Sequence, residues 1–173
     1  MGCGDTLLTL NANAKINLTL DILGTREDGY HEVAMIMQEI SLHDTLSMGK
    51  INQDISLTIV IEGQQGTLPA DESNLCWKAA ALVQKEYNLQ EGVEIHLTKR
   101  IPMAAGLAGG SADAAAVLKG MNHLFRLGMT EARLCELGAR LGSDIPFCIM
   151  GGTMLATGRG EVLTRLPRLP RLS

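Results

Sequence analysis

Aromatic side chains are scarce in this sequence, and their scarcity sets the character of its core. Phe, Trp and Tyr together make up 3% of the 173 residues, although 46% of the residues are apolar. A core of that size is therefore expected to consist of Leu, Ile, Val, Met and Ala. The length suits one ordinary domain, or one large domain of a longer protein.

Three further absences exclude classes of function. Positive charge is not in excess, because the formal net charge is −4, and this argues against nucleic-acid binding through a broad basic surface. No apolar run is long enough to span a membrane. No CxxC pair or Cys/His zinc pattern occurs, since the cysteines are widely spaced, at Cys3, Cys76, Cys135 and Cys148. Reduced thiols and a cytoplasmic location are expected.

Alternation of apolar and polar residues predicts the strands. In residues 15–23, Ile16, Leu18, Leu20 and Ile22 alternate with polar residues and predict a half-buried strand. Asp28-Gly29 then marks a loop or hairpin turn. Further strands are expected within 34–48, 54–62 and 93–99, and residues 144–157 are interpreted as a loop followed by a strand.

Helical periodicity predicts three helices after residue 71. The first spans 72–87, with Ser73 or Asn74 as its N-cap. The second runs from about Ala112 to Phe125, and a third follows Thr130 as its cap. Because strands cluster early and helices later, in mixed order, an α+β fold is favoured over a doubly wound sheet.

The stretch "IPMAAGLAGGSADAAAVLKG" (101–120) places Gly106, Gly109 and Gly110 directly before the second helix. Small residues let the backbone approach an anion, and the free N–H groups of a helix start favour negative charge. The stretch is neither a Walker loop nor a GxGxxG dinucleotide motif. Two interpretations stay open: a phosphate-binding loop, or a tight turn that packs a helix closely on the sheet.

The same stretch resembles the phosphate-binding motif of the GHMP kinases, the galactokinase, homoserine kinase, mevalonate kinase and phosphomevalonate kinase superfamily. Three more stretches are similar to one branch of it: "AKINLTLDILGTREDGYHEV" (14–33), "LGSDIPFCIMGG" (141–152) and "ATGRGE" (156–161). The resemblance runs from about residue 9 to about residue 170. It implies a ribosomal protein S5 domain 2-like fold.

The resemblance also implies an activity. Members of this branch use ATP, with Mg²⁺, to phosphorylate the 2-hydroxyl of a cytidine diphosphate-linked methylerythritol on the non-mevalonate route to isoprenoid precursors. The expected partners are therefore ATP and a small-molecule substrate, without nucleic acid or membrane. Among the metal ligands, Ser111 is one candidate, and the sequence identifies no others.

Site residues follow from the resemblance, position by position. Lys15 and Asp144 are implied as catalytic, Lys15 orienting the acceptor hydroxyl and the γ-phosphate and Asp144 acting as base. Asn17, Tyr30 and His31 are implied to bind substrate. The residues implied to bind nucleotide are Pro102, Met103, Ala104, Ala105, Gly106, Leu107, Ala108, Gly109, Gly110, Ser111 and Ala112, with Asn74 and Lys99 flanking the adenine. From the residues alone, Lys15 could be a surface lysine and Asp144 a turn or helix cap.

Proteins of this superfamily have a second, C-terminal domain, so residues 1–173 are expected to be the N-terminal domain alone. An exposed apolar face and self-association are expected where the second domain would dock. Three hypotheses follow: the kinase described above, a sister GHMP kinase acting on another small alcohol, and a nucleotide-binding module without turnover.

Overall fold

The computed structural model describes residues 7–25, 27, 29, 31–158 and 160–167. The fold is built around a long antiparallel pair of strands. In this pair β1 (Leu8–Thr25) runs beside β2 (His31–Ile51), with Thr25 opposite His31 and Leu8 opposite Met48. This pairing confirms the expected hairpin between residues 25 and 31, although Asp28 of the predicted turn lies outside the described residues. Four more strands complete one mixed sheet: β3 (Ile55–Ile61), β4 (Gly92–Lys99), β5 (Thr153–Thr157) and β6 (Val162–Arg165).

The central strand is β2, because one of its edges pairs with β1 and the other with two strands in succession. The order is β3-β4-β2-β5-β6, with β1 beside β2. Among the strands of the described residues, only β3 and β4 pair in parallel. The crossover between them contains α1 (Leu75–Tyr87), as a parallel connection requires. The α+β class predicted from the sequence is confirmed.

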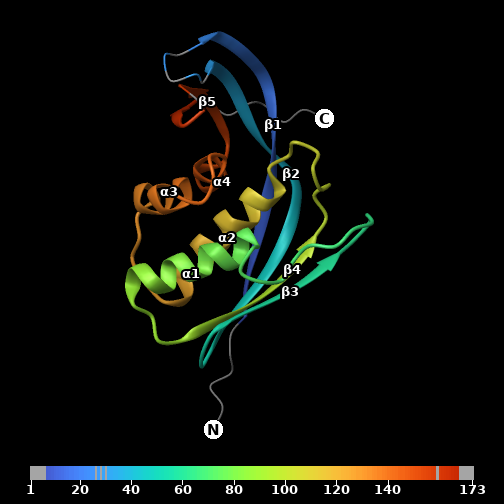
Figure 1. The fold of residues 1–173 in the computed structure, drawn as a ribbon, viewed down its shortest axis with the longest axis vertical. Coiled ribbons are helices and arrows are strands. Elements are labelled where there is room, and N and C mark those ends of the chain that lie inside the picture. The colour runs from blue at the N-terminus through green and yellow to red at the C-terminus, as the bar shows by residue number, and fades with distance from the viewer. Residues whose placement is uncertain (1–6, 26, 28, 30, 159, 168–173) are drawn as a thin grey trace.

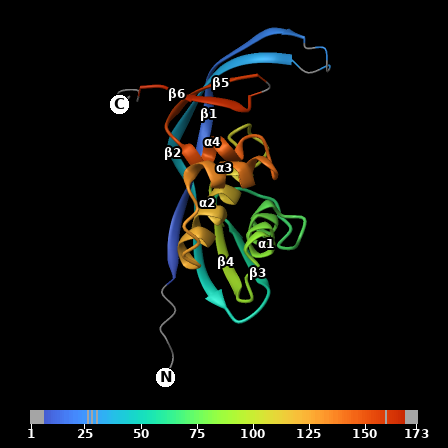
Figure 2. The ribbon, with the colours of Figure 1, turned by 90° about the vertical axis from the view of Figure 1, so that its left-hand side faces the viewer.

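Helices cover one face of this sheet. They are α1, α2 (Gly109–Leu124), α3 (Glu131–Ala139) and α4 (Ile145–Met150), and they lie on the same side of the strands (Figures 1 and 2). Val93, Ile95 and Leu97 of β4 are buried beneath them, whereas His96 on the opposite face is exposed. This alternation is what one covered and one open sheet face produce.

The caps of α1 and α3 are those predicted from the sequence. The Oδ1 atom of Asn74 accepts a hydrogen bond from the Cys76 N–H (2.8 Å), and Thr130 accepts one from the Arg133 N–H (3.2 Å). The start predicted for α2 was wrong by three residues: the helix begins at Gly109, so Gly109, Gly110 and Ser111 form its first turn.

Two other predictions were wrong. Residues 145–150 form the short helix α4, in a segment interpreted as a loop followed by a strand. Pro146 lies in the first turn, where its missing N–H has no intrahelical partner to lose. In the outer half of β1, Leu18, Leu20 and Ile22 are 43%, 55% and 64% exposed, although their alternation predicted a half-buried strand. This part of the β1–β2 hairpin projects past the helices (Figures 1 and 2), so no helix covers it.

Within the part of the chain that the structure describes, every helix is too short or too polar to cross a lipid bilayer.

Candidate active site

The segment between β4 and α2 is a loop with an alternating backbone. Ala104, Gly106 and Ala108 have φ values of 56°, 73° and 55°, whereas Ala105 and Leu107 between them do not have positive φ. Such alternation points successive N–H groups toward one place and makes an anion-binding nest. A left-handed backbone conformation costs an alanine about 1–2 kcal/mol, so the backbone of this loop is strained at both alanines.

The N–H groups of this loop face no protein acceptor. From Ala104 through Ser111, no backbone N–H donates a hydrogen bond to any residue in the described ranges, and no side chain caps the start of α2. The first regular bond of the helix runs from the Ala112 N–H to the Ala108 carbonyl (2.9 Å). A row of unpaired N–H groups, reinforced by the positive end of a 16-residue helix, suits a polyphosphate.

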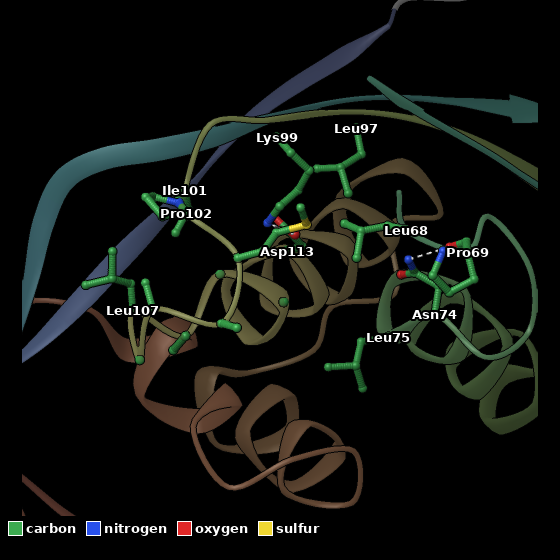
Figure 3. Close-up of a pocket in the computed structure, with 17 residues that line it drawn as sticks. Leu68, Pro69, Asn74, Leu75, Leu97, Lys99, Ile101, Pro102, Leu107 and Asp113 are labelled. Atoms are coloured by element: carbon green, nitrogen blue, oxygen red, sulfur yellow. Dashed lines mark hydrogen bonds and ion pairs between the residues drawn. The ribbon is translucent and has the colours of Figure 1, made fainter. Parts of the chain in front are cut away.

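A cavity of about 400 Å³ opens beside the loop (Figure 3). Pro102 to Gly110 form one wall, so all nine of these predicted nucleotide residues line it. The rest of the lining is mostly apolar and includes Leu68, Pro69, Leu75, Leu97 and Ile101. Apolar side chains beside a row of N–H donors fit a heterocyclic base joined to phosphates. Ser111 and Ala112 do not line the cavity, and Ala112 is buried.

Asn74 and Lys99 line the same cavity, but their polar atoms are already engaged. The Oδ1 atom of Asn74 caps α1, and its Nδ2 donates to the Pro69 carbonyl (2.8 Å). The Lys99 ammonium is buried and donates to Asp44 and to Asp113. These contacts fix both side chains in the cavity wall, and each nitrogen keeps one donor hydrogen beyond the bonds to described residues.

Lys15 is not at the start of a strand but inside β1, and a bulge sets its direction. The register between β1 and β2 shifts between Asn13 and Lys15, so that Ala14 and Lys15 are both buried. A bulge of this kind re-aims a side chain. The Lys15 N–H donates to the Leu107 carbonyl (3.1 Å), and its ammonium donates to Asn17 Oδ1 (3.0 Å). The surface interpretation of Lys15 is therefore wrong, and its backbone is joined to the loop between β4 and α2 at Leu107.

Asp144 stands at the N-cap position of α4, yet its side chain makes no capping hydrogen bond. The cap interpretation therefore does not account for this carboxylate. Instead, its charge lies close enough to Cys148 to raise the pKa of that thiol, which burial and Asp144 together bring to about 12. Lys15 and Lys119 act on the same thiol and lower its pKa. The charges of Lys15 in β1 and of Asp144 before α4 thus both act on the Cys148 thiol.

The structure does not bring the expected substrate residues together. Asn17 is beside Lys15, and its side chain accepts the lysine hydrogen bond. His31 is exposed at the first position of β2, on the projecting part of the hairpin. Tyr30 lies outside the described residues.

Sequence reasoning missed two buried carboxylates, Asp44 and Asp113. Asp44 precedes Leu46 and Met48 on the covered face of β2, and Lys99 follows Ile95 and Leu97 on the covered face of β4. A charged residue at an inward position of an alternating strand was the available signal. Asp113, four residues before the buried Val117 of α2, carries the same signal at helical spacing.

Comparisons with known proteins match the part of the chain that contains these residues. The model of the GHMP kinases N-terminal domain matches residues 74–152, which include Asn74, the loop and Asp144. The 4-diphosphocytidyl-2-C-methyl-D-erythritol kinase of Acetivibrio thermocellus is 52% identical over 160 residues, covering 92% of this chain and 55% of the relative. The protein of that name from Synechococcus sp. (strain JA-2-3B'a(2-13)) is 59% identical over 158 residues, covering 91% and 50%.

Solved structures match over the same extent. A crystal structure of 4-(cytidine 5'-diphospho)-2C-methyl-D-erythritol kinase superposes with a TM-score of 0.80 at 37% identity, over 92% of this chain and 55% of the other. The Methanococcus jannaschii mevalonate kinase gives a TM-score of 0.69 at 14% identity, over 96% and 57%, which is a likeness of fold. The chain therefore spans about half the length of the curated relatives it matches.

Proposed function

The chain carries a GHMP kinase N-terminal domain, and we propose that it is the catalytic and ATP-binding half of a 4-diphosphocytidyl-2-C-methyl-D-erythritol kinase. The observation that carries this proposal is the loop at 104–111, whose N–H groups lack protein acceptors and border an apolar cavity. The names of the relatives at 52% and 59% identity support the choice of substrate.

The reaction needs few protein groups. The oxygen of the substrate 2-hydroxyl attacks the γ-phosphorus of ATP, the bond to the β,γ-bridging oxygen breaks, and ADP leaves. Asp144 accepts the proton of the attacking hydroxyl, and its side chain is available because it caps no helix. Lys15 stabilises the charge on the transferred group. Phosphoryl transfer depends mostly on such positioning and charge neutralisation, so the N–H cradle and Lys15, joined at Leu107, act as one unit.

Mg²⁺ fits this site as a companion of the nucleotide. No group of three or more His, Cys, Asp or Glu side chains within the described residues is arranged to hold a metal. Mg²⁺ typically keeps several waters and takes one or two protein ligands beside substrate phosphates. The Ser111 hydroxyl, in the first turn of α2, is a ligand of suitable type. The ion would neutralise charge on the phosphates.

Substrate binding is assigned to Asn17, Tyr30 and His31, of which Tyr30 and His31 would hold the cytosine. Asn17 reaches the reaction centre through its bond to Lys15, whereas His31 is on the projecting hairpin. A substrate that spans both would lie along β1. A cytoplasmic location and self-association through the exposed hairpin complete the proposal.

The second candidate is a nucleotide-binding module without turnover. The chain spans about half of each relative, and binding of an extended substrate commonly needs contacts from both sides of a cleft. A sister GHMP kinase acting on another small alcohol is not favoured, because mevalonate kinase resembles this chain in fold at only 14% identity.

The test is ATP-dependent phosphorylation of 4-diphosphocytidyl-2-C-methyl-D-erythritol by this chain, with Asp144→Asn beside it. Loss of the base should lower turnover about 100-fold or more, with ATP binding retained. Glu91→Gln is the matched control, because it removes an exposed carboxylate that pairs with Lys50 at the far end of β4 and should leave turnover unchanged.

ATP binding without turnover would favour the second candidate. Absence of ATP binding would overturn both.

A further inference from the structure

Three ionisable side chains lie buried directly beneath the phosphate loop. Asp44 of β2, Lys99 of β4 and Asp113 of α2 are 0%, 3% and 3% exposed. The Lys99 ammonium donates to the Oδ2 atoms of both carboxylates, at 2.7 Å for Asp113, and Figure 3 shows Lys99 and Asp113 together at the cavity wall. A buried ion cluster contributes less to stability than well-packed apolar side chains of similar volume. The presence of this cluster therefore points to a role in positioning the loop.

Asp44 holds the beginning of the loop. Its Oδ1 atom accepts hydrogen bonds from the N–H groups of Arg100 (2.5 Å) and Ile101 (2.8 Å), the two residues that follow β4. Hydrogen bonds from backbone N–H groups to a charged acceptor are about twice as strong as neutral ones. The first loop residues are therefore fixed to the central strand of the sheet.

Lys99 and Asp113 hold the other end. Asp113 is the fifth residue of α2, so its bond to Lys99 ties the first turns of the helix to β4. Gly109 allows the close approach: a Cβ atom there would lie 3.1 Å from the Lys99 Nζ and 3.1 Å from the Ile101 Cγ2. The cluster thus consists of one ammonium shared between carboxylates that hold the two ends of a single loop.

We propose that Asp44, Lys99 and Asp113 act as a clamp, a set of positioning residues that holds both ends of the phosphate loop so that its N–H groups converge on one anion. The inference rests on the proposed nucleotide-binding function of that loop. No member of the clamp needs to touch the nucleotide.

The two carboxylates of the clamp are not equivalent. Asp44 accepts three hydrogen bonds, whereas Asp113 accepts one, and its buried Oδ1 atom has no partner in the described structure. One ammonium cannot neutralise both carboxylates. Asp113, which accepts fewer hydrogen bonds, is therefore the carboxylate that takes up a proton. Burial, opposed by Lys99 and aided by Asp44, raises the pKa of Asp113 to about 8.

This difference gives the clamp a pH dependence. The charged and titratable groups around Asp113 are Lys99, Asp44 and the Cys76 thiol of α1. Burial and Asp113 raise the pKa of Cys76, so this thiol stays neutral. When Asp113 ionises as the pH rises through about 8, the clamp gains a net negative charge beside the site for a polyphosphate, and ATP affinity falls.

The first experiment measures amide hydrogen exchange by NMR, without nucleotide, in the wild-type chain and in Asp44→Asn. The reporters are Met103 and Ala112, whose N–H groups are hydrogen-bonded but not to Asp44. Both should exchange about tenfold faster or more in Asp44→Asn, because the loop loses a charged anchor, while α3 is unchanged. Glu62→Gln is the matched control: it removes an exposed carboxylate that also pairs with Arg100 and should leave both reporters unchanged.

Unchanged exchange in Asp44→Asn, or equal acceleration in the loop and in α3, would overturn the clamp. These outcomes do not depend on ATP.

The second experiment measures MgATP binding by calorimetry between pH 7 and 9.5. Wild-type affinity should fall above pH 8 relative to Asp113→Asn, whose profile lacks this step, and Asp44→Asn should bind about tenfold more weakly at pH 7. Parallel pH profiles for the wild type and Asp113→Asn would overturn the role of Asp113. If the wild type binds no ATP, the proposed function fails, while the exchange experiment still decides the clamp.

Discussion

The covered half of the sheet and the projecting hairpin carry the same sequence pattern and reach opposite burial. Val93, Ile95 and Leu97 alternate with polar residues on β4 and are buried. Leu18, Leu20 and Ile22 alternate in the same way on β1 and are exposed. Alternation therefore specifies which side chains share a face, and only a second layer decides whether that face is buried.

The largest expected contrast between the covered half of the sheet and the hairpin is in how much stability is lost when a leucine is truncated. Leu97→Ala should lower the free energy of unfolding by about 2–5 kcal/mol, because the site is enclosed and leaves a cavity. Leu20→Ala, the same change on the hairpin, should alter it by about 0.5 kcal/mol or less. Urea denaturation followed by circular dichroism measures both. Equal losses would mean that the hairpin is covered in solution, as self-association would do.

A smaller effect is expected from adding one methyl group to a strand glycine. In Gly92→Ala, the new Cβ would lie 2.1 Å from the Asp54 carbonyl oxygen, so the backbone must move at a cost of about 1–3 kcal/mol. Gly24→Ala on the hairpin meets nothing within 4 Å and should change the stability by about 0.5 kcal/mol or less. Thermal unfolding of the two variants separates these outcomes, and similar melting temperatures would contradict the comparison.

The smallest effect concerns the surface of the covered half. Hydrogen bonds from Arg140 and Arg133 lower the pKa of Glu86, so its ionised form stabilises the fold above its unfolded-state pKa and this gain is lost as the pH falls through the folded value. Glu86→Gln should therefore lower the urea midpoint slightly at pH 7 and not at pH 3. High salt should shrink the difference. The control is Glu72→Gln, at an exposed residue, and a Glu86→Gln effect that persists at pH 3 would exclude the ion pairs as its cause.

Much of the fold was predictable because its signals are local. The strands within 34–48, 54–62 and 93–99 and the caps Asn74 and Thr130 follow from alternation and from capping chemistry. The helix α4 was missed because six residues are too few for a helical period to show. The exposure of Leu20 was missed because it depends on whether another layer is present, which no local pattern records.

The site, like the fold, was predictable only where its signals are local in the sequence. The loop could be identified from its small residues, but its strain falls on Ala104 and Ala108 as well as on Gly106, and composition alone points only to the glycine. The bulge that buries Lys15 depends on pairing with β2. The bond between Asp44 and Lys99 joins residues 55 positions apart, so no spacing within one element predicts it. The roles of Lys15 and Asp144 stay predictions until turnover is measured.

The central position of β2 has a consequence for the order in which the chain matures on the ribosome. One edge of this strand is shared by β4, which pairs with residues 45–51, and by β5, which pairs with residues 35–38. Met37 must await Met154, more than one hundred residues later in synthesis. At cellular elongation rates that interval is on the order of ten seconds. During it, this strand edge is unpaired and open to intermolecular association, and it stays so for longer than residues 45–51, whose partner β4 is made earlier.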